Sequence, residues 1–457
     1  MQLFNRYVSP RGLTVFGCEI LLIFGSVAIA ARAHGAGADV AHDIWKIALI
    51  TGLCQVCFYY NDLYDLTIVH SSRELLIRLL QAAGVASILV AVLYLLIPSL
   101  AIGNRIFVSS LVIFLLAIVG WRLLFNRLAY SSQLEERVLI VGTGPTARTV
   151  ARQIQAQHDF GYRVVGFIDE ADERGQGVLN PATIGAPEDI PRIVGQYQVD
   201  RIVVGLADRR GRLPISELLQ AKLSGVRVED ATTTYERLTG KILIDGLRPS
   251  WLIFSDGFVI SRWTRFAKRL FDLVLASVGF ALAAPFTLLT ALAVYLDSDG
   301  PILYCQERVG ENGRVFTVYK FRSMRADAEA SGGPVWAQNN DGRVTRVGRF
   351  IRKTRLDELP QLWNVLRGDM SFVGPRPERP FFVEQLAQEI PFYQQRHAVK
   401  PGVTGWAQVK YEYGSSVEDA MEKLRYDLYY IKHLSIALDL SIVFDTVKVV
   451  MFGKGAR

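Results

Sequence analysis

Four long apolar segments alternate with short polar stretches at the start of the chain. They cover residues 13–32, 44–60, 79–98 and 106–125. Each is close to the length of about 20 apolar residues that a helix needs to cross a bilayer. We therefore predict a membrane protein with four transmembrane helices in residues 1–130.

Basic residues gather on one side of these segments. The loop between the first two segments has none beyond Arg32 at its edge, and the loop between the last two has only Arg105. Cytoplasmic loops carry the excess of Lys and Arg, so we predict that the N-terminus and everything after the fourth span are cytoplasmic. The arginines on this side are Arg6, Arg11, Arg73, Arg78, Arg122, Arg127 and Arg137.

Residues 131–250 change to the pattern of a Rossmann-like α/β domain. The runs RVLIVG, VVGFIDE and RIVVGLAD alternate with helical stretches, which predicts a parallel doubly wound sheet. Gly142-x-Gly144-x-x-Ala147 has the spacing of a dinucleotide-binding loop, and Asp169 ends the second run. The fingerprint alone has little specificity, and the chain contains no Tyr-x-x-x-Lys pair. Nucleotide binding therefore stays open beside a regulatory or dimerising role.

A fifth apolar run covers residues 273–296, with Pro285 at its middle and basic residues on both sides. A full span would place the basic residues beyond it outside, against the charge bias of cytoplasmic loops. Proline kinks a helix because it lacks a backbone donor. We therefore predict a re-entrant helix over about residues 268–296, within a domain of residues 251–457.

After this run, ILYCQERVGENGRVFTVYKFRSM predicts two strands joined by a glycine turn. Lys320 and Arg322 would share one face of the second strand and provide two anion contacts. A solvated edge strand is the alternative. The arginines that follow at intervals of three predict a basic helical stripe facing anionic lipid: Arg343, Arg346, Arg349, Arg352 and Arg355.

The richest stretch chemically is residues 353–380. Asp357 and Glu358 are adjacent, and Arg376 lies between two prolines. Paired carboxylates can hold a divalent cation, and one can attack an electrophile. Arg352, Arg355 and Arg376 suit phosphate oxygens. The alternative is a surface helix whose first turn favours acidic residues.

Composition narrows the choice of partners. The chain is 50% hydrophobic with a formal net charge of +7, and its basic residues lie beside apolar segments. This distribution predicts that the partners of the chain are a membrane surface and phosphate ligands, and that nucleic acid is not among them. Cys54 and Cys57 lie within an apolar run with no second pair, so we expect neither a disulfide framework nor a metal site there.

Several motifs together resemble the bacterial sugar transferases, the monotopic phosphoglycosyl transferases that begin exopolysaccharide, capsule and O-antigen assembly. The resemblance covers residues 262–457 and rests on KFRSM, TRLDELPQLWNVLRGDMSFVGPRPE, PGVTGWAQV and LRYDLYYIKHLSIALDL. Four spans followed by a Rossmann-like domain resemble the large polyprenyl subfamily. ERLTGKILIDGLRPSWLIF and FGKGAR are similar to its exosortase-associated branch.

The resemblance implies transfer of hexose-1-phosphate, from UDP-glucose or UDP-galactose, to undecaprenyl phosphate with release of UMP. Asp357 would be the nucleophile that forms a phosphosugar-aspartyl intermediate, and Glu358 a Mg²⁺ ligand or general base. Arg376 would contact the donor. His433 and Asp439 lie in the last motif, and a direct role for either stays open.

The resemblance also implies a multi-pass protein of the bacterial inner membrane, with both later domains on the cytoplasmic face and a homodimer through the middle domain. One departure is Ala284, where family members commonly have a serine before the bending proline; Thr287 is a candidate substitute. The alternatives are a membrane-bound nucleotide-sugar dehydratase or oxidoreductase, and a non-enzymatic scaffold for polysaccharide assembly.

Overall fold

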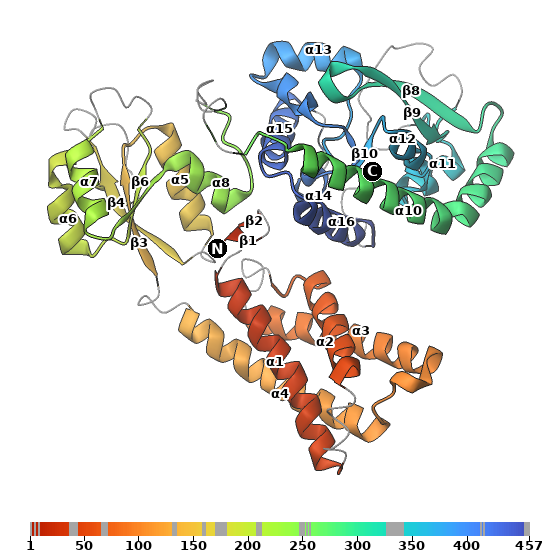
Figure 1. Cartoon of the computed structure of the whole chain (residues 1–457), viewed down its shortest axis with the longest axis horizontal. Helices are drawn as coiled ribbons and strands as arrows, with labels where there is room; N and C mark the ends of the chain where they lie inside the picture. The colour runs from red at the N-terminus through yellow and green to blue at the C-terminus, as the bar shows by residue number, and fades with distance from the viewer. Residues whose placement is uncertain are drawn as a thin grey trace. The chain divides into compact units, whose positions relative to one another are not determined.

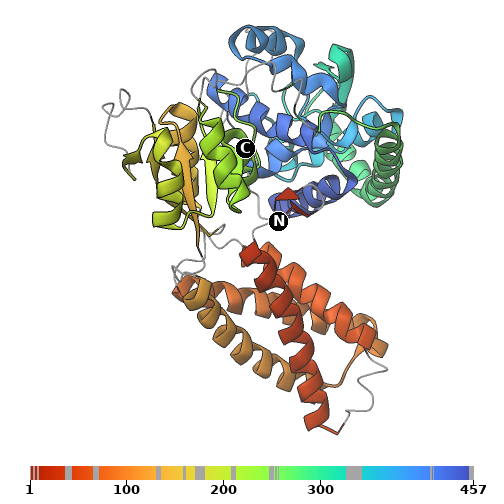
Figure 2. The ribbon, with the colours of Figure 1, turned by 60° about the vertical axis from the view of Figure 1, so that its left-hand side comes forward.

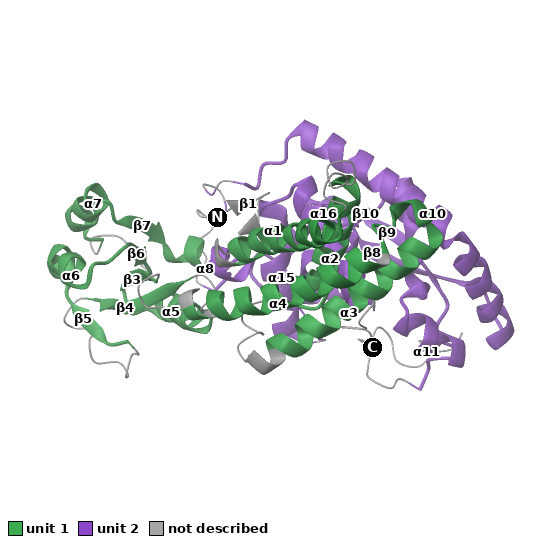
Figure 3. Ribbon diagram, turned by 90° about the horizontal axis from the view of Figure 1, so that it is seen from below, with its two compact units in different colours: residues 1, 7–234 green, residues 2–6, 235–457 purple. Residues whose placement is uncertain are grey.

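A computed structural model describes residues 2–3, 6–7, 10–35, 44–64, 72–129, 135–157, 161–169, 181–206, 213–245, 252, 255, 257–325, 342–411, 414 and 416–451. They form two compact units (Figure 3), one of residues 1 and 7–234 and the other of residues 2–6 and 235–457. FGKGAR and the GLRPSW part of the linker lie outside the described residues.

The N-terminal bundle consists of α1 (Pro10–Ala33), α2 (Ile44–Tyr60), α3 (Ser72–Leu96) and α4 (Asn104–Ala129). In Figure 2 the four helices lie side by side, and α1 packs along α4 while α2 packs along α3. All four predicted helices are therefore present. A short 3-10 turn, Pro98–Leu100, follows α3.

Length separates α2 from the other three helices. Apolar stretches of 21 or 22 residues occur in α1, α3 and α4, whereas α2 has 17 residues. At about 1.5 Å per residue α2 covers about 26 Å, slightly less than a hydrocarbon core of about 30 Å. Within the described ranges, the fourth helix long enough to span is α10 (Arg262–Asp297), in the second unit.

Arg122 was expected in a cytoplasmic flank, but the structure places it elsewhere. It lies within α4 with 1% of its surface exposed, and its Nε donates a hydrogen bond of 2.7 Å to Oε1 of Glu19 in α1. A buried charge needs such a partner in an apolar surrounding. This pair fixes α1 against α4, and the basic flank on that side is correspondingly smaller.

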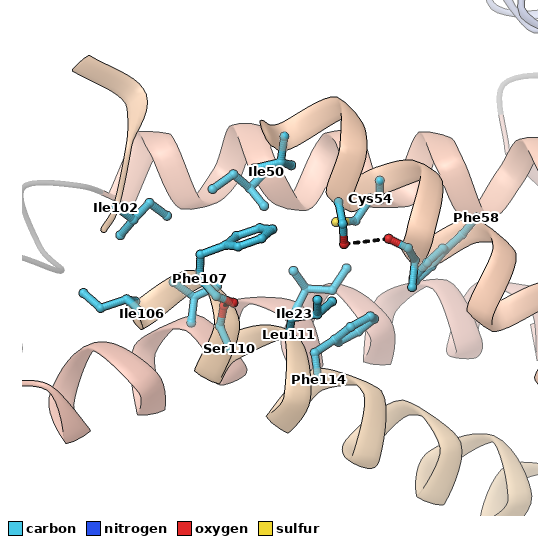
Figure 4. Close-up of a pocket in the computed structure, with 15 residues that line it drawn as sticks. Ile23, Ile50, Cys54, Phe58, Ile102, Ile106, Phe107, Ser110, Leu111 and Phe114 are labelled. Carbon is cyan, nitrogen blue, oxygen red and sulfur yellow. Dashed lines mark hydrogen bonds between the residues drawn. The ribbon is translucent and has the colours of Figure 1, made fainter. Parts of the chain in front are cut away.

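The bundle also contains a small, partly open apolar pocket of about 50 Å³. Figure 4 shows side chains from all four helices around it, among them Ile23, Cys54 and Phe114, with Ser110 as a polar member. Because none of the predicted site residues lines it, this pocket is separate from the candidate chemistry.

The middle of the chain forms the predicted parallel sheet. Its strands are β3 (Glu136–Val141), β4 (Tyr162–Ile168), β5 (Thr183–Gly185), β6 (Arg201–Val204) and β7 (Arg227–Asp230), in the order β5-β4-β3-β6-β7. All its described pairings are parallel, and this order is that of doubly wound sheets. Its helices are α5 (Pro145–Ala156), α6 (Ile190–Tyr197) and α7 (Ile215–Leu223). The next helix, α8 (Ala231–Thr239), contains the boundary between the two units.

The second unit is built around α10, an antiparallel hairpin and a two-stranded parallel sheet (Figure 1). The hairpin consists of β8 (Leu303–Val309) and β9 (Val315–Phe321), and the sheet of β10 (Ser371–Val373) and β11 (Gly402–Thr404). The main core packs α13 (Pro380–Glu389), α14 (Trp406–Lys410), α15 (Val417–Lys432) and α16 (Ile436–Met451). Short elements complete the unit: α11 (Arg346–Lys353), η8 (Leu356–Glu358), α12 (Gln361–Arg367) and η9 (Tyr393–Ala398).

This unit begins at Tyr235 rather than at residue 251. Ile242 and Ile244 are buried in its main core. The backbone N–H of Ile242 donates to the carbonyl of Arg425 at 3.0 Å, and the indole of Trp406 donates to the carbonyl of Gly240 at 2.9 Å. The linker residues before 246 therefore belong to the second unit.

The helix α10 is one continuous helix of 36 residues, longer than the predicted 268–296. It contains Pro285, and Figure 1 shows that it changes direction along its length. The Thr287 hydroxyl donates to the carbonyl of Ala283 at 2.9 Å. Pro285 leaves a different carbonyl, that of Ala281, without its helical donor, so Thr287 does not replace the missing bond.

Candidate active site

Asp357 and Glu358 lie on η8, a short turn between α11 and α12. Arg355, which precedes this turn, has a φ of 60°, a left-handed conformation that is uncommon outside glycine. Pro360 is the N-cap of α12. This local geometry presents the two adjacent acids to different surroundings.

Glu358 is the centre of a cluster of positive charges. Its Oε1 accepts hydrogen bonds from Lys320 Nζ at 3.0 Å and from Arg376 Nη2 at 2.6 Å, and Arg355 lies 3.7 Å from its Oε2. Burial raises the pKa of Glu358, but the surrounding cations outweigh this and hold the pKa well below its ordinary value. Glu358 is therefore a firmly ionised carboxylate.

Asp357 has a different environment. Among the residues that the structure describes, none donates a hydrogen bond to its carboxylate. Burial and the adjacent charge of Glu358 raise the pKa of Asp357 to about 6, while Lys320, Arg376 and Arg352 act in the opposite direction. The result is a carboxylate that is mostly ionised at neutral pH and available for reaction.

Lys320 reaches Glu358 because α12 is fixed to β9. The amide of Asn364 is completely buried; it donates to the carbonyl of Thr317 at 2.7 Å and accepts from the N–H of Tyr319 at 3.2 Å. A buried amide satisfied on both sides sets the register of the helix on the strand. No motif in the sequence had indicated this role for Asn364.

Arg322 does not join this cluster. It follows the end of β9, and its buried guanidinium donates to the carbonyl of Ser298 at 2.5 Å and to that of Asp299 at 2.9 Å. These carbonyls follow the C-terminal end of α10, where a cation is favourable. The expected common face of Lys320 and Arg322 is therefore wrong, because the alternation ends with the strand at Phe321.

The loop around Arg376 depends on close backbone approach. A Cβ on Gly374 would lie 2.4 Å from the carbonyl oxygen of Lys400, so only glycine fits there. The N–H of Gly374 donates to the carbonyl of Thr404 at 2.8 Å. These contacts join β10 to β11 and present Arg376, which is partly exposed, to Glu358.

His433 and Asp439, the two residues in the last motif, contact groups other than Glu358. Asp439 has no exposed surface; it accepts from Lys268 Nζ at 2.7 Å and from the Tyr430 hydroxyl at 2.8 Å. The His433 ring contacts Glu236. The carboxylates of Asp439 and Glu236 thus accept contacts that join helices to one another, and these contacts favour structural roles for Asp439 and His433.

In the middle domain, Gly142 and Gly144 do lie between β3 and α5. Gly142 has a φ of 98°, and Asp169 at the end of β4 accepts hydrogen bonds from both the N–H and the hydroxyl of Thr143. In dinucleotide-binding folds an acid after the second strand binds a ribose hydroxyl. Here Asp169 instead holds the glycine loop.

The acids of η8 can also be compared with what Mg²⁺ requires. The described residues contain no group of three His, Cys, Asp or Glu side chains suited to a metal. Mg²⁺ is often held by one or two carboxylates together with substrate phosphates and water. Asp357 and Oε2 of Glu358 accept no described hydrogen bond, so they fit a Mg²⁺ ion of that kind.

The chain thus combines helices long and apolar enough to cross a membrane with a buried carboxylate pair surrounded by basic side chains. The sequence model of the family described as "Bacterial sugar transferase" matches residues 263–453, and one described as "CoA-binding domain" matches residues 60–220. Among similar proteins is an Aeromonas hydrophila UDP-N-acetylgalactosamine-undecaprenyl-phosphate N-acetylgalactosaminephosphotransferase, 45% identical over 52% of this chain and 56% of its own length.

Two UDP-glucose:undecaprenyl-phosphate glucose-1-phosphate transferases are also similar. The Klebsiella pneumoniae protein is 34% identical over 71% of this chain and 69% of its own length. The Xanthomonas campestris pv. campestris protein is 29% identical over 100% of this chain and 96% of its own length. The chain belongs to the bacterial sugar transferase family. It spans little more than half the length of the Aeromonas relative.

Proposed function

We propose that this protein transfers hexose-1-phosphate from a UDP-hexose to undecaprenyl phosphate. In the first step an oxygen of Asp357 attacks the sugar-linked phosphorus, and UMP leaves with the electron pair of the broken P–O bond. In the second step an oxygen of the lipid phosphate attacks the same phosphorus and releases Asp357. This would be the first membrane step of exopolysaccharide, capsule or O-antigen synthesis.

The contrast between the two acids carries the proposal. Glu358 is neutralised by Lys320 and Arg376, whereas Asp357 is uncommitted and has a pKa raised to about 6. An anionic nucleophile attacks an anionic phosphate only where positive charge offsets the repulsion. The cluster supplies this charge beside an available carboxylate, a combination that supports nucleophilic catalysis by Asp357.

Several basic residues would contact the donor. Arg376 and Lys320 lie at Glu358, while Arg352 and Arg355 come from α11 and the turn after it. Arginine binds phosphate oxygens through paired donors. A Mg²⁺ ion held by Asp357, Glu358 and the donor would offset the charge of the diphosphate.

The contacts of α10 support a re-entrant helix. At its first end, Lys268 and Arg269 donate to the carbonyls of Val373 and Val365. At its other end, Asp297 accepts from the N–H of Val347 at 3.1 Å. Both ends thus contact one compact unit, while four large apolar residues between them are mostly exposed: Leu282, Phe286, Leu288 and Leu289.

A helix with both ends on the same water-soluble unit would enter the bilayer and return to the same side. Its exposed apolar middle would then lie among the lipid chains, where apolar surface is favoured. Pro285 provides a place for the bend. This arrangement would put the active site at the cytoplasmic face of the bacterial inner membrane, next to the lipid phosphate.

The hexose is a matter for experiment. The names of similar proteins mention glucose and N-acetylgalactosamine, and glucose or galactose was expected from the resemblance. The direct test is UMP release by the purified protein with Mg²⁺, undecaprenyl phosphate and a panel of UDP-sugars that includes the N-acetyl forms. Lipid-dependent release with one sugar supports the proposal, and no release with any of them contradicts it.

A further inference from the structure

We propose that Arg396 is a positioning residue for the site that binds the sugar donor. Arg396 acts by fixing the backbone of Arg376. This rests on the proposed function in one respect: Arg376 is taken as a donor contact. Arg396 itself would touch neither substrate. It lies on η9, and no feature of the sequence had indicated it.

The carbonyl groups in the loop of residues 374–378 need hydrogen-bond donors from outside the loop. Pro375 and Pro377 have no N–H, so the loop cannot satisfy its own carbonyls in the usual way. Other elements supply the donors instead. Two of them are backbone groups: the N–H of Gly402 donates to the carbonyl of Pro375 at 2.9 Å, and the N–H of Val309 donates to the carbonyl of Glu378 at 2.9 Å. The other two are arginine side chains. Arg396 Nη2 donates to the carbonyl of Arg376 at 3.0 Å, and Arg308 Nη1 donates to the carbonyl of Pro377 at 3.0 Å.

Among these hydrogen-bond donors, Arg396 holds the carbonyl of Arg376 itself. Its side chain is buried, with 6% of its surface exposed, and forms an ion pair of 2.8 Å with Asp427, whose side chain is 2% exposed. Its Nη1 donates to the Tyr393 hydroxyl at 2.6 Å. The guanidinium is thus fixed on two sides before it reaches Arg376.

Asp427 comes from α15, which is part of the main core of the unit. The contact from Nη2 to Oδ2 is an ion pair whose angle departs from hydrogen-bond geometry. Removing either partner leaves a buried charge uncompensated. The Arg396–Asp427 pair therefore transmits the rigidity of the core to the loop.

The chemical consequence concerns the direction of the Arg376 side chain. That side chain meets Glu358 at 2.6 Å, and a phosphate contact tolerates displacements of only about 0.5 Å. If the Arg376 carbonyl loses its partner, the guanidinium is free to shift while the protein remains folded. The expected defect is in donor binding.

The test compares three variants of the full-length protein. Arg396→Gln removes the charge, Arg396→Lys keeps a charge for Asp427 but loses the planar fork, and Asp427→Asn weakens the pair from the other side. Glu236→Gln is the matched control: Glu236 is equally buried in the same unit and pairs with Lys432 at 2.7 Å, without contact to the loop.

Two measurements are made on each variant. One is the affinity for UDP by calorimetry, and the other is the KM for UDP-glucose and each further sugar that the wild type uses. Loss of one charged hydrogen bond predicts an affinity about tenfold weaker for Arg396→Gln and a comparable rise in KM. Arg396→Lys should keep most of the thermal stability but not the donor affinity, and Glu236→Gln should keep the affinity.

Unchanged UDP affinity in folded Arg396→Lys and Asp427→Asn would overturn the proposal, even if Arg396→Gln fails to fold. An equal loss of affinity in Glu236→Gln would also overturn it, because the effect would then be general destabilisation. A wild type that binds UDP but transfers no sugar would contradict the proposed function alone. A wild type that does not bind UDP would contradict Arg376 as the donor contact, and with it the role of Arg396.

Discussion

Arg376 Nη2 lies 2.6 Å from Oε1 of Glu358, and this hydrogen bond joins the loop after β10 to the acidic turn η8. Lys320 occupies the same oxygen from β9 at 3.0 Å. With two donors on one oxygen, Glu358 stays ionised and fixed in place. The neighbouring Asp357 has no described hydrogen-bond donor, so the two acids of the pair are suited to different tasks.

The pKa of Asp357, raised to about 6, predicts the acid limb of the pH profile. The nucleophile must be ionised, so the rate should be half of its maximum near pH 6. Below that value it should fall about tenfold per pH unit. An ordinary aspartate would keep its charge to below pH 4, and a flat profile down to pH 5 would contradict the assignment. The measurement is kcat/KM for the donor between pH 5 and 8.

Replacing Arg376 by alanine should weaken donor binding. The change removes the proposed phosphate contact and one of the cations beside Glu358, so KM should rise about tenfold or more. Arg367→Ala is a suitable control, because Arg367 ends α12 on the surface and pairs with Asp369. Undiminished UDP affinity in Arg376→Ala would refute its assignment.

Arg322→Gln should act on stability. Its guanidinium holds the carbonyls after α10, so its loss should lower the free energy of unfolding by about 3 kcal/mol while UDP affinity stays unchanged. Thermal unfolding and UDP titration, measured together, test this. If Arg322→Gln unfolds at the same temperature as the wild type but binds UDP more weakly, Arg322 would instead be a substrate contact.

Cys305 offers a test of the re-entrant helix with a natural side chain. It is exposed on β8, just beyond α10. If α10 returns to the cytoplasmic side, a membrane-impermeant thiol reagent should label Cys305 only after the cells are permeabilised. A Ser99→Cys variant, in the predicted outer turn between α3 and α4, should be labelled in intact cells. Labelling of Cys305 in intact cells, absent in Cys305→Ser, would mean that α10 spans the membrane.

Local patterns in the sequence predicted the elements well. Long apolar runs gave the bundle helices and α10, because backbone groups in lipid must be satisfied within a helix. The alternation of strand and helix gave the parallel sheet. Arg122 was misplaced because its partner Glu19 lies more than a hundred residues away. The start of the second unit at Tyr235 also depends on tertiary packing.

The candidate site was predictable only in part. Asp357 and Glu358 are neighbours in the chain, so their pairing could be read directly. The approach of Lys320 and Arg376 to Glu358 depends on how β9, α12 and the loop pack. Their selection as site residues relied on a basic strand end and a proline-flanked arginine. Arg396 and Asp427 have no such signal, since only the fold brings them together.

The most direct test of the account is UMP release without lipid. With a UDP-sugar that the protein uses, in the absence of undecaprenyl phosphate, the wild type should release about one UMP per protein molecule and gain the mass of one hexose phosphate, because the first step stops at the covalent intermediate. Asp357→Asn should give neither the burst nor the mass. A burst of undiminished size in Asp357→Asn, or adduct mass on a peptide without residue 357, would contradict the central claim that Asp357 is the nucleophile.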